Sequence, residues 1–442
     1  MAVRGYGRKK TIAAVLLCAV LTAVLLGACG SGAGEAAGPR KVTVIRDVEF
    51  FDESAADESE ESGEGEDESI FAGLIREDGT VDITKVPHLY FYPLINDYRA
   101  FDPDVVSEAR ITVNNSNNLT PAEFREILEQ LYAAGFMLVR FTDLVRIENT
   151  PGGILVEPNE NLVLPKGKLP LLLTEDNVNY HHSTDNTGYA SKIVLRNGRL
   201  SCLYVNANGT EKVGDYDAVP ILENFIGKHP DFSYNGARMT LALTGYNGVL
   251  GYRTDDAYRT RSGLTDLQKK WLDDNPDFDY EAEAEAAKET ADALKAAGYE
   301  FANKTWGDRI VSSATLTDLK VDLEKWKASA RPILGDVRIY VFGHDSDIAE
   351  DGGEYGPDNN KFSYYASEGY CIFCVSGHGL YTGEISGRNY VKSVRFPLTP
   401  YVLKTASVWG DQWISETVTA LGVRNIAAFL DHERPGSYIY IS

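Results

Sequence analysis

One pattern recurs four times along the chain: a helical segment, then a glycine, then a short apolar run typical of a strand. The glycines that end these helical segments are Gly135, Gly298, Gly369 and Gly422. A glycine just past the last helical turn accepts the left-handed conformation that closes a helix. Helices that alternate with short buried strands favour a parallel sheet. The chain is therefore predicted to belong to the α/β class.

Eight apolar runs have the length of a strand. They are Leu89–Tyr92, Phe136–Phe141, Leu171–Thr174, Met239–Thr244, Tyr299–Ala302, Val337–Phe342, Tyr370–Val375 and Val423–Leu430. The helix that ends at Gly135 also has a start signal, because Thr120 and Glu123 have the spacing of a capping box. About eight strands separated by helices suit a closed or nearly closed (β/α) barrel.

One stretch departs from this alternation. Residues 192–205 form two strand-like runs around Asn197-Gly198, and Asn-Gly is the strongest two-residue signal for a β-hairpin. A second Asn208-Gly209 indicates a third strand. We therefore predict an antiparallel β-hairpin insertion at about residues 188–215, in the loop after the strand that ends at Thr174.

The N-terminus has the pattern of a secretory signal. Basic residues in the first ten positions precede the apolar stretch 12–26. Its end, Leu26-Gly27-Ala28-Cys29, resembles a bacterial lipobox, which implies a signal peptide at 1–28 and lipidation of Cys29. About 15 apolar residues is short for a membrane span, which needs ~20. The predicted location is the outer face of the cell membrane, held by the lipid anchor alone.

A low-complexity acidic segment follows the anchor. Residues 52–68 are almost entirely Asp, Glu, Ser, Gly and Ala, so they have little to bury and predict a disordered linker within residues 29–80. The formal net charge of −22 argues against nucleic acid as a partner, because phosphate binding needs a basic surface. Residues 81–442 are then predicted to form the folded domain.

Three of the five cysteines remain for that domain: Cys202, Cys371 and Cys374. The last two have CxxC spacing, which is compatible with a redox pair or half a metal site. They lie inside the apolar run Tyr370–Val375, however, and the sequence has no second CxxC. We therefore expect packed thiols.

A short polar segment follows the strand at 171–174, at the rim where α/β barrels collect catalytic groups. It reads Thr174-Glu175-Asp176-Asn177, and it resembles the first motif of the polysaccharide deacetylases (carbohydrate esterase family 4), Thr/Ser-x-Asp-Asp. In that family the first Asp is a general base and the second holds a divalent metal. The resemblance implies Asp176 as candidate base and places Asn177 at a metal-ligand position.

Two further segments extend the resemblance, which runs from about Lys85 to Pro435. Residues 301–308 are similar to the family's second motif, His-x-x-x-His, with Lys304 and Asp308 at the positions of the two ligand histidines. Residues 340–343 are similar to the third motif, without its Arg and Pro. The implied fold is a deformed (β/α)7–8 barrel of the polysaccharide deacetylase type, carrying the hairpin insertion.

These substitutions change the charge of the implied metal site. Asn177 offers a neutral oxygen, and the ammonium of Lys304 repels a cation. We predict that Lys304 takes the place of the metal and bridges Asp176 and Asp308, since a buried ammonium needs such partners. No cofactor is then expected. If the protein is instead an active enzyme with rearranged ligands, zinc, cobalt or nickel would occupy the site, and the adjacent His181 and His182 are alternative ligands.

Aromatic residues just beyond the predicted strand ends indicate a carbohydrate cleft. Sugars stack their apolar faces on aromatic rings, and arginine supplies fixed hydrogen-bond donors. The candidate substrate-binding residues are Tyr180, Tyr246, Tyr252, Arg253 and Trp306. Packing in the core is the alternative for each tyrosine.

The predicted function is that of a deacetylase-like lipoprotein of the cell envelope, which binds cell-wall or extracellular glycan through a degenerate, metal-poor active site. A second hypothesis is a working metal-dependent carbohydrate deacetylase or hydrolase with Asp176 as base. A third is the solute-binding lipoprotein of a transporter, which should show two similar α/β lobes joined by a hinge.

Overall fold

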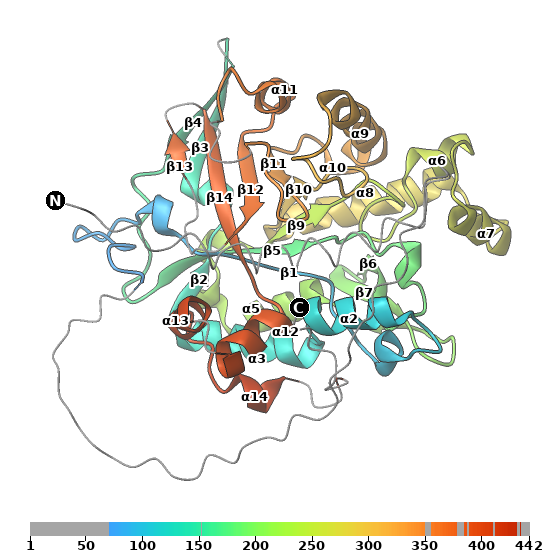
Figure 1. Cartoon of the computed structure of the whole chain (residues 1–442), viewed down its shortest axis with the longest axis horizontal. Coiled ribbons are helices and arrows are strands. Elements are labelled where there is room, and N and C mark those ends of the chain that lie inside the picture. Colours follow the sequence, from blue (N-terminus) through green and yellow to red (C-terminus); the bar gives the residue numbers. More distant parts are fainter. Residues whose placement is uncertain are drawn as a thin grey trace, which may run out of the picture.

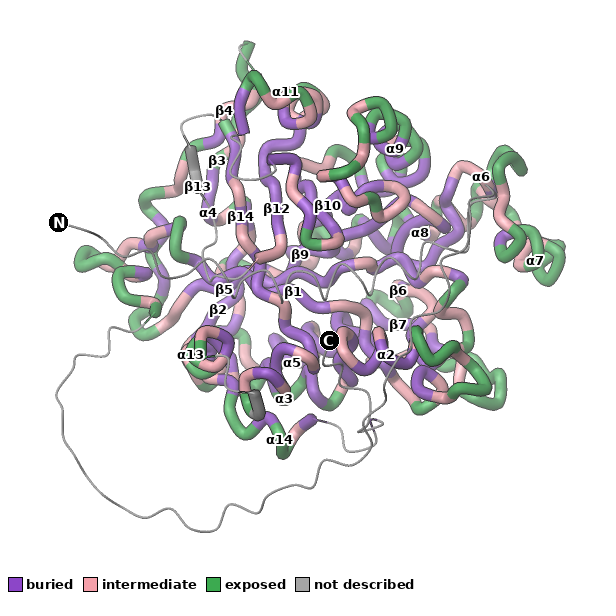
Figure 2. Tube along the Cα trace, viewed as in Figure 1, coloured by how far each residue is buried: buried purple, intermediate pink, exposed green. Residues whose placement is uncertain are grey.

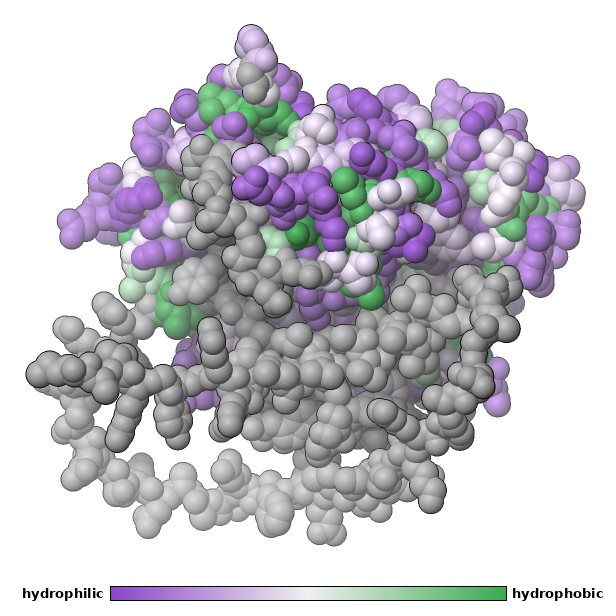
Figure 3. Space-filling view, turned by 45° about the horizontal axis from the view of Figure 1, so that its top comes forward, coloured by the Kyte–Doolittle hydropathy of each residue, from purple (hydrophilic) through white to green (hydrophobic). Residues whose placement is uncertain are grey.

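The computed structural model of the chain describes residues 70–434 except 152, 350–354, 378–383, 387–388, 410–411 and 431–433. The predicted signal peptide, Cys29 and the acidic run therefore lie outside the described residues and stay predictions. Within the described part, no helix is long and apolar enough to cross a bilayer. Where Figure 3 colours the surface, it is largely hydrophilic, with apolar residues in separate patches.

Seven parallel strands close into a barrel (Figure 1). In order around the barrel they are β1 (His88–Phe91), β5 (Leu169–Asp176), β9 (Thr240–Leu243), β10 (Glu300–Asn303), β11 (Ile339–Val341), β12 (Ile372–Ser376) and β14 (Tyr390–Pro397). The ring closes where β1 pairs with both β5 and β14. The predicted deformed (β/α)7–8 barrel is thus confirmed.

Two more strands extend the barrel sheet without joining the ring. The parallel strand β2 (Phe136–Leu138) pairs with the first three residues of β5, whereas β9 pairs with its last three. The short β13 (Glu384–Ser386) lies antiparallel to β14. The segment at 136–141 was expected as a full barrel strand, and the structure shortens it because the chain turns into α4 at Phe141.

Amphipathic helices cover the outside of the barrel, and Figure 2 shows their buried sides facing the strands. The longest are α3 (Pro121–Ala133), α5 (Ala218–Lys228), α8 (Tyr280–Ala297) and α9 (Leu316–Ser329). The capping box predicted for α3 is present: Glu123 N–H donates to Thr120 Oγ1 at 3.3 Å, and Thr120 N–H donates to the Glu123 carboxylate at 2.7 Å. These two bonds fix where α3 begins.

The other described elements connect or flank this core. They are η2 (Ile83–Lys85), η3 (Tyr98–Phe101), α2 (Glu108–Asn117), α4 (Phe141–Leu144), η4 (His182–Thr184), η5 (Pro230–Phe232), η6 (Tyr234–Gly236), α6 (Asp256–Thr260), α7 (Asp266–Asp274), α10 (Arg331–Leu334), α11 (Asn360–Ser367), α12 (Pro400–Lys404), η8 (Thr405–Trp409), α13 (Gln412–Ala420) and α14 (Ile426–Phe429). A second hairpin, β3 (Val145–Thr150) with β4 (Gly153–Pro158), was not predicted.

The last predicted strand, Val423–Leu430, is wrong. The segment contains the helical turn α14, because its buried residues Val423, Ile426 and Leu430 recur every three to four positions rather than every two. The barrel closes through β14 instead. This strand was not predicted because it contains the polar residues Ser393 and Arg395. Both side chains are buried, and both form hydrogen bonds inside the barrel.

The predicted insertion is a three-stranded antiparallel sheet of β6 (Ala190–Arg196), β7 (Arg199–Val205) and β8 (Glu211–Gly214). Asn197 (φ 53°) and Gly198 (φ 75°) form its first turn with the left-handed conformations that a tight hairpin needs. The sheet packs on α5 and α8 beside the barrel (Figure 1). It is also tied to the loop after β1 by a backbone bond from Asn96 N–H to the Gly188 carbonyl.

Candidate functional site

Strained backbone concentrates at the carboxyl ends of the barrel strands, which we call the barrel mouth. In the loops after β5, β10 and β11, the non-glycine residues with left-handed backbone include Asn177 (φ 62°), Thr305 (64°), Asp308 (49°), His344 (58°) and Asp345 (48°). Such conformations are uncommon outside glycine and cluster at binding and active sites. The barrel mouth is therefore the candidate site, and it contains the residues singled out from the sequence.

The innermost group at the mouth is an ion pair between Asp176 and Arg395. Arg395 Nη1 donates to Asp176 Oδ1 at 2.7 Å and Nη2 donates to Oδ2 at 3.2 Å, and the two side chains are only 0% and 2% exposed. The guanidinium also lies 4.3 Å from the centre of the Tyr90 ring. Burial lowers the pKa of Arg395, but Asp176 more than offsets this and raises it, so the arginine stays charged.

A second ion pair lies nearer the solvent. Lys304 Nζ donates to Asp308 Oδ1 at 2.7 Å, and His344 Nε2 lies 3.5 Å from Asp308 Oδ2. Lys304 is 3% exposed, whereas Asp308 is 33% exposed. Burial raises the pKa of Asp308, but Lys304 and His344 outweigh burial and hold it well below its ordinary value. Asp308 is thus a carboxylate at neutral pH.

Gly343 allows the loop after β11 to approach this second pair. A Cβ at position 343 would lie 2.7 Å from Asp308 Oδ1 and 3.0 Å from Lys304 Nζ. Distances this short force a side chain to move. The glycine at the end of the third-motif segment therefore leaves room for the Lys304–Asp308 pair.

The structure corrects the bridge predicted for Lys304. Lys304 pairs with Asp308 as expected, but Asp176 is held by Arg395, and no ion pair joins Lys304 to Asp176 among the described residues. The one local signal for Arg395 is that it lies between the apolar residues Val394 and Phe396, and no strand was predicted there. The sequence carried no indication of the partner, because the two residues are 219 positions apart.

The side chains at the mouth do not fit a divalent cation. Both oxygens of Asp176 accept from Arg395, one oxygen of Asp308 accepts from Lys304, and Asn177 supplies only a neutral amide. Two cationic side chains thus lie where ligands would be needed. Across the described residues, no group of three or more His, Cys, Asp or Glu side chains is placed to hold a metal ion.

The two adjacent histidines point to different partners. His182 uses both ring nitrogens, at 2.6 Å from Asp185 Oδ2 and 2.6 Å from the Tyr258 hydroxyl. His181 instead stacks on Tyr246, with ring centres 5.5 Å apart and planes 27° apart. They are not arranged as a joint ligand pair.

Three partly exposed rings form what we call the rim platform: His181, Tyr246 and Trp306. Tyr246 packs edge-on against Trp306 at 5.5 Å, and Tyr246 N–H donates to the Trp306 carbonyl at 3.0 Å. Burial lowers the pKa of His181 to about 4, so its ring is neutral at neutral pH. The three rings are uncharged at neutral pH and lie next to the Lys304–Asp308 pair, while the ammonium of Lys325 lies over the Trp306 ring, 4.2 Å from its centre.

The other three predicted glycan-binding residues lie beneath the rim rather than on it. Tyr180, Tyr252 and Arg253 are 2%, 5% and 4% exposed. Their polar groups are engaged within the protein, since the Tyr180 hydroxyl donates to Asp217 at 2.7 Å and Arg253 Nη1 donates to the Tyr180 carbonyl at 2.8 Å. The Tyr252 hydroxyl lies 2.8 Å from Thr290 Oγ1. In this structure they support the rim loops.

The three cysteines of the folded domain are free and buried. Burial raises the pKa of Cys371 to about 11 and that of Cys374 to about 12, so both are neutral thiols at neutral pH. The expectation of packed thiols at 371 and 374 is confirmed.

Comparison with known proteins gives structural likenesses only. No family model matches the chain, and no curated protein matches it significantly. A polysaccharide deacetylase from Bacillus cereus is similar in structure at 11% identity, with a TM-score of 0.37 over 76% of this chain and 68% of that one. A deacetylase from Streptococcus pyogenes in complex with acetate is similar at 12% identity, with a TM-score of 0.36 over 76% and 97%.

Proposed function

We propose that this chain is a glycan-binding protein of the cell envelope, built on a deacetylase-like barrel in which ion pairs replace the metal site. One observation carries the proposal: Asp176, the candidate base, is sealed in a two-bond ion pair with Arg395. A base must be within reach of the proton that it removes. With both oxygens occupied and the side chain 2% exposed, Asp176 is a structural anchor of the barrel mouth.

The rim platform supplies the binding surface. Sugar rings present C–H groups on one face, and these pack on the electron-rich faces of aromatic rings. Tyr246 and Trp306 are partly exposed and fixed against each other, so little side-chain freedom is lost when a ligand binds. The exposed part of Asp308 offers a nearby acceptor for sugar hydroxyls.

The location of the protein enters the proposal from the sequence alone. Lipidation of Cys29 would hold the barrel at the outer face of the membrane, and the acidic segment would separate it from the bilayer. The ligand is then cell-wall or extracellular glycan. The two lobes expected of a solute-binding protein are not what the described residues form, since seven strands close into one barrel.

Binding can be followed at the platform itself. Trp306 is the reporter, since its fluorescence should change when N-acetylated chito-oligosaccharides reach Tyr246. Tyr246→Ala should weaken this binding by roughly tenfold, or about 1.4 kcal/mol. Tyr364→Ala on α11 is the matched control, because Tyr364 is a partly exposed tyrosine like Tyr246 but lies outside the rim platform.

The same preparation separates binding from catalysis. The proposal expects saturable binding without release of acetate. Acetate release that is lost in Asp176→Asn and on addition of a chelator would instead establish the working deacetylase.

A further inference from the structure

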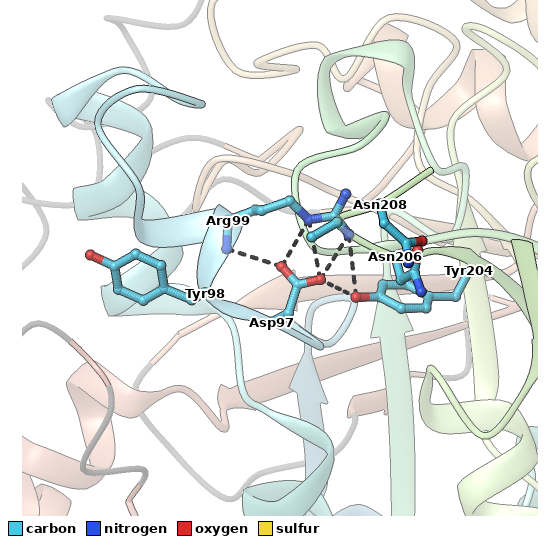
Figure 4. Close-up of a pocket in the computed structure, with 7 residues that line it drawn as sticks. Asp97, Tyr98, Arg99, Tyr204, Asn206 and Asn208 are labelled. Atoms are coloured by element: carbon cyan, nitrogen blue, oxygen red, sulfur yellow. Dashed lines mark hydrogen bonds and ion pairs between the residues drawn. The ribbon is translucent and has the colours of Figure 1, made fainter. Parts of the chain in front are cut away.

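A depression of about 480 Å³ lies between η3 and the turn that joins β7 to β8, and it shares no residue with the barrel mouth or the rim platform (Figure 4). Its walls come from two segments that are about a hundred residues apart in the sequence. The lining residues with polar side chains are Asp97, Tyr98, Arg99, Tyr204, Asn206 and Asn208. The insertion thus completes this depression.

A rigid hydrogen-bond network forms one side of the depression. Arg99 donates to Asp97 through Nε at 3.0 Å and through Nη2 at 2.7 Å, and it donates to the Val205 carbonyl at 2.6 Å. The Tyr204 hydroxyl also donates to Asp97, and the Tyr204 ring stacks on Tyr216 at 4.5 Å. The network ties η3 to β7, so the shape exists before any ligand binds.

The groups left open are hydrogen-bond donors and one aromatic ring. Tyr98 is 59% exposed and lies on one side of the Asp97–Arg99 pair, while Asn206 and Asn208 lie on the other (Figure 4). The Oδ1 atoms of both asparagines accept from Thr210 N–H, at 2.9 Å and 3.1 Å. Within the described residues, neither amide NH2 group nor Arg99 Nη1 donates a hydrogen bond, so these groups remain as donors among the lining residues.

These open groups define the chemistry of a ligand. It must present several oxygen acceptors to the amides and to Arg99, and an apolar face to the Tyr98 ring. The carboxylate of Asp97 is already paired with Arg99, so the depression offers no unpaired negative charge to a cationic ligand. The net charge of −22 disfavours a polyanion. A neutral saccharide with hydroxyl or acetamido oxygens meets all of these conditions.

We infer that the depression between η3 and the β7–β8 turn is a second saccharide-binding site, which takes the same class of neutral glycan as the rim platform. The inference rests on the proposed function for its ligand class, but it stands on separate residues. Two sites on one chain bind a long glycan more tightly than either site alone, because the second contact becomes intramolecular.

Isothermal titration of the full-length chain with tri-N-acetylchitotriose tests this inference, since a ligand this short reports the sites separately. The expected stoichiometry is two ligands per chain. Tyr98→Ala and Ala207→Trp should each reduce it to one, the first by removing the ring and the second by filling the depression. Val213→Ala, an exposed residue of β8 outside the depression, should leave it at two.

The variants also separate this inference from the proposed function. Trp306→Ala should leave one site, and adding Tyr98→Ala to it should leave none. A parent that binds one ligand, lost in Trp306→Ala and kept in Tyr98→Ala, overturns the second site and leaves the rim platform standing. A parent that binds one ligand, lost in Tyr98→Ala and kept in Trp306→Ala, supports the second site and overturns the rim platform. A parent that binds none overturns both.

Discussion

The two ion pairs at the barrel mouth have similar distances but different access to solvent. Arg395 and Asp176 form two hydrogen bonds with both side chains sealed, whereas Asp308, which pairs with Lys304, is 33% exposed. A buried charge without its partner costs several kcal/mol, while a solvent-exposed pair contributes little. The inner pair therefore holds the barrel together, and the outer pair is the one that a ligand can reach.

The largest effect should come from breaking the inner pair. Arg395→Met leaves Asp176 as an uncompensated buried carboxylate, so the free energy of unfolding should fall by roughly 3–5 kcal/mol. Chemical denaturation followed by circular dichroism measures this change.

The double variant Asp176→Asn with Arg395→Met is the control. It removes both charges and should recover much of the lost stability, because no unpaired charge remains. A single Arg395→Met variant as stable as the parent would mean that the pair is not sealed from water.

Breaking the outer pair should have a smaller effect. Lys304→Met should lower the free energy of unfolding by roughly 1–2 kcal/mol, since Asp308 keeps its contact with His344 and with solvent. Lys270→Met is the matched control, because Lys270 pairs with Asp274 at the same spacing of four residues, with both side chains more than half exposed. An equal loss in the two variants would contradict the distinction between a buried and an exposed lysine.

The same variant predicts a change in acid stability. The folded-state pKa of Asp308 is held below its ordinary value, so its contribution to stability is complete above the ordinary pKa and is lost as the pH falls below it. Lys304→Met removes a cause of this depression. Its unfolding free energy should therefore depend less steeply on pH below about 4 than that of the parent.

Most strands of the barrel sheet could be predicted from the sequence. Apolar runs predicted seven of the strands in the barrel sheet, because buried parallel strands are continuous apolar runs, and three of these runs follow a helix that ends in glycine. β14 was missed since its interior face carries Ser393 and Arg395. Their partners, His88 and Asp176, are about 305 and 219 residues away in the chain, so no local pattern connects them.

The candidate site could also be predicted only in part, because local spacing is visible in the sequence and long-range contacts are not. Lys304 lies four residues before Asp308 in the sequence. In the structure, the loop after β10 brings the two side chains together as an ion pair. All four aromatic residues follow predicted strand ends, so the sequence could not show which of them are exposed. Tyr246 and Trp306 lie on the rim, whereas Tyr180 and Tyr252 are buried below it. That difference depends on how the loops pack on α8 and on Asp217.

A smaller effect concerns His181 in the rim platform. Burial lowers its pKa from 6.5 to about 4, so between these values the unfolded chain binds a proton that the folded chain does not. Stability should therefore decrease as the pH falls through this interval. His181→Gln should flatten this part of the curve without abolishing it, because the pKa values of His88 and His182 are also lowered by burial. An unchanged curve would place His181 in open solvent.

The most direct test of the central claim, that ion pairs replace the metal, is the metal content of the purified full-length chain. Inductively coupled plasma mass spectrometry after dialysis against zinc, cobalt or nickel should find well below one equivalent of each, because Arg395 and Lys304 occupy the carboxylates that a cation would need. One tightly held equivalent per chain that is lost in Asp308→Asn or Asp176→Asn would contradict the account.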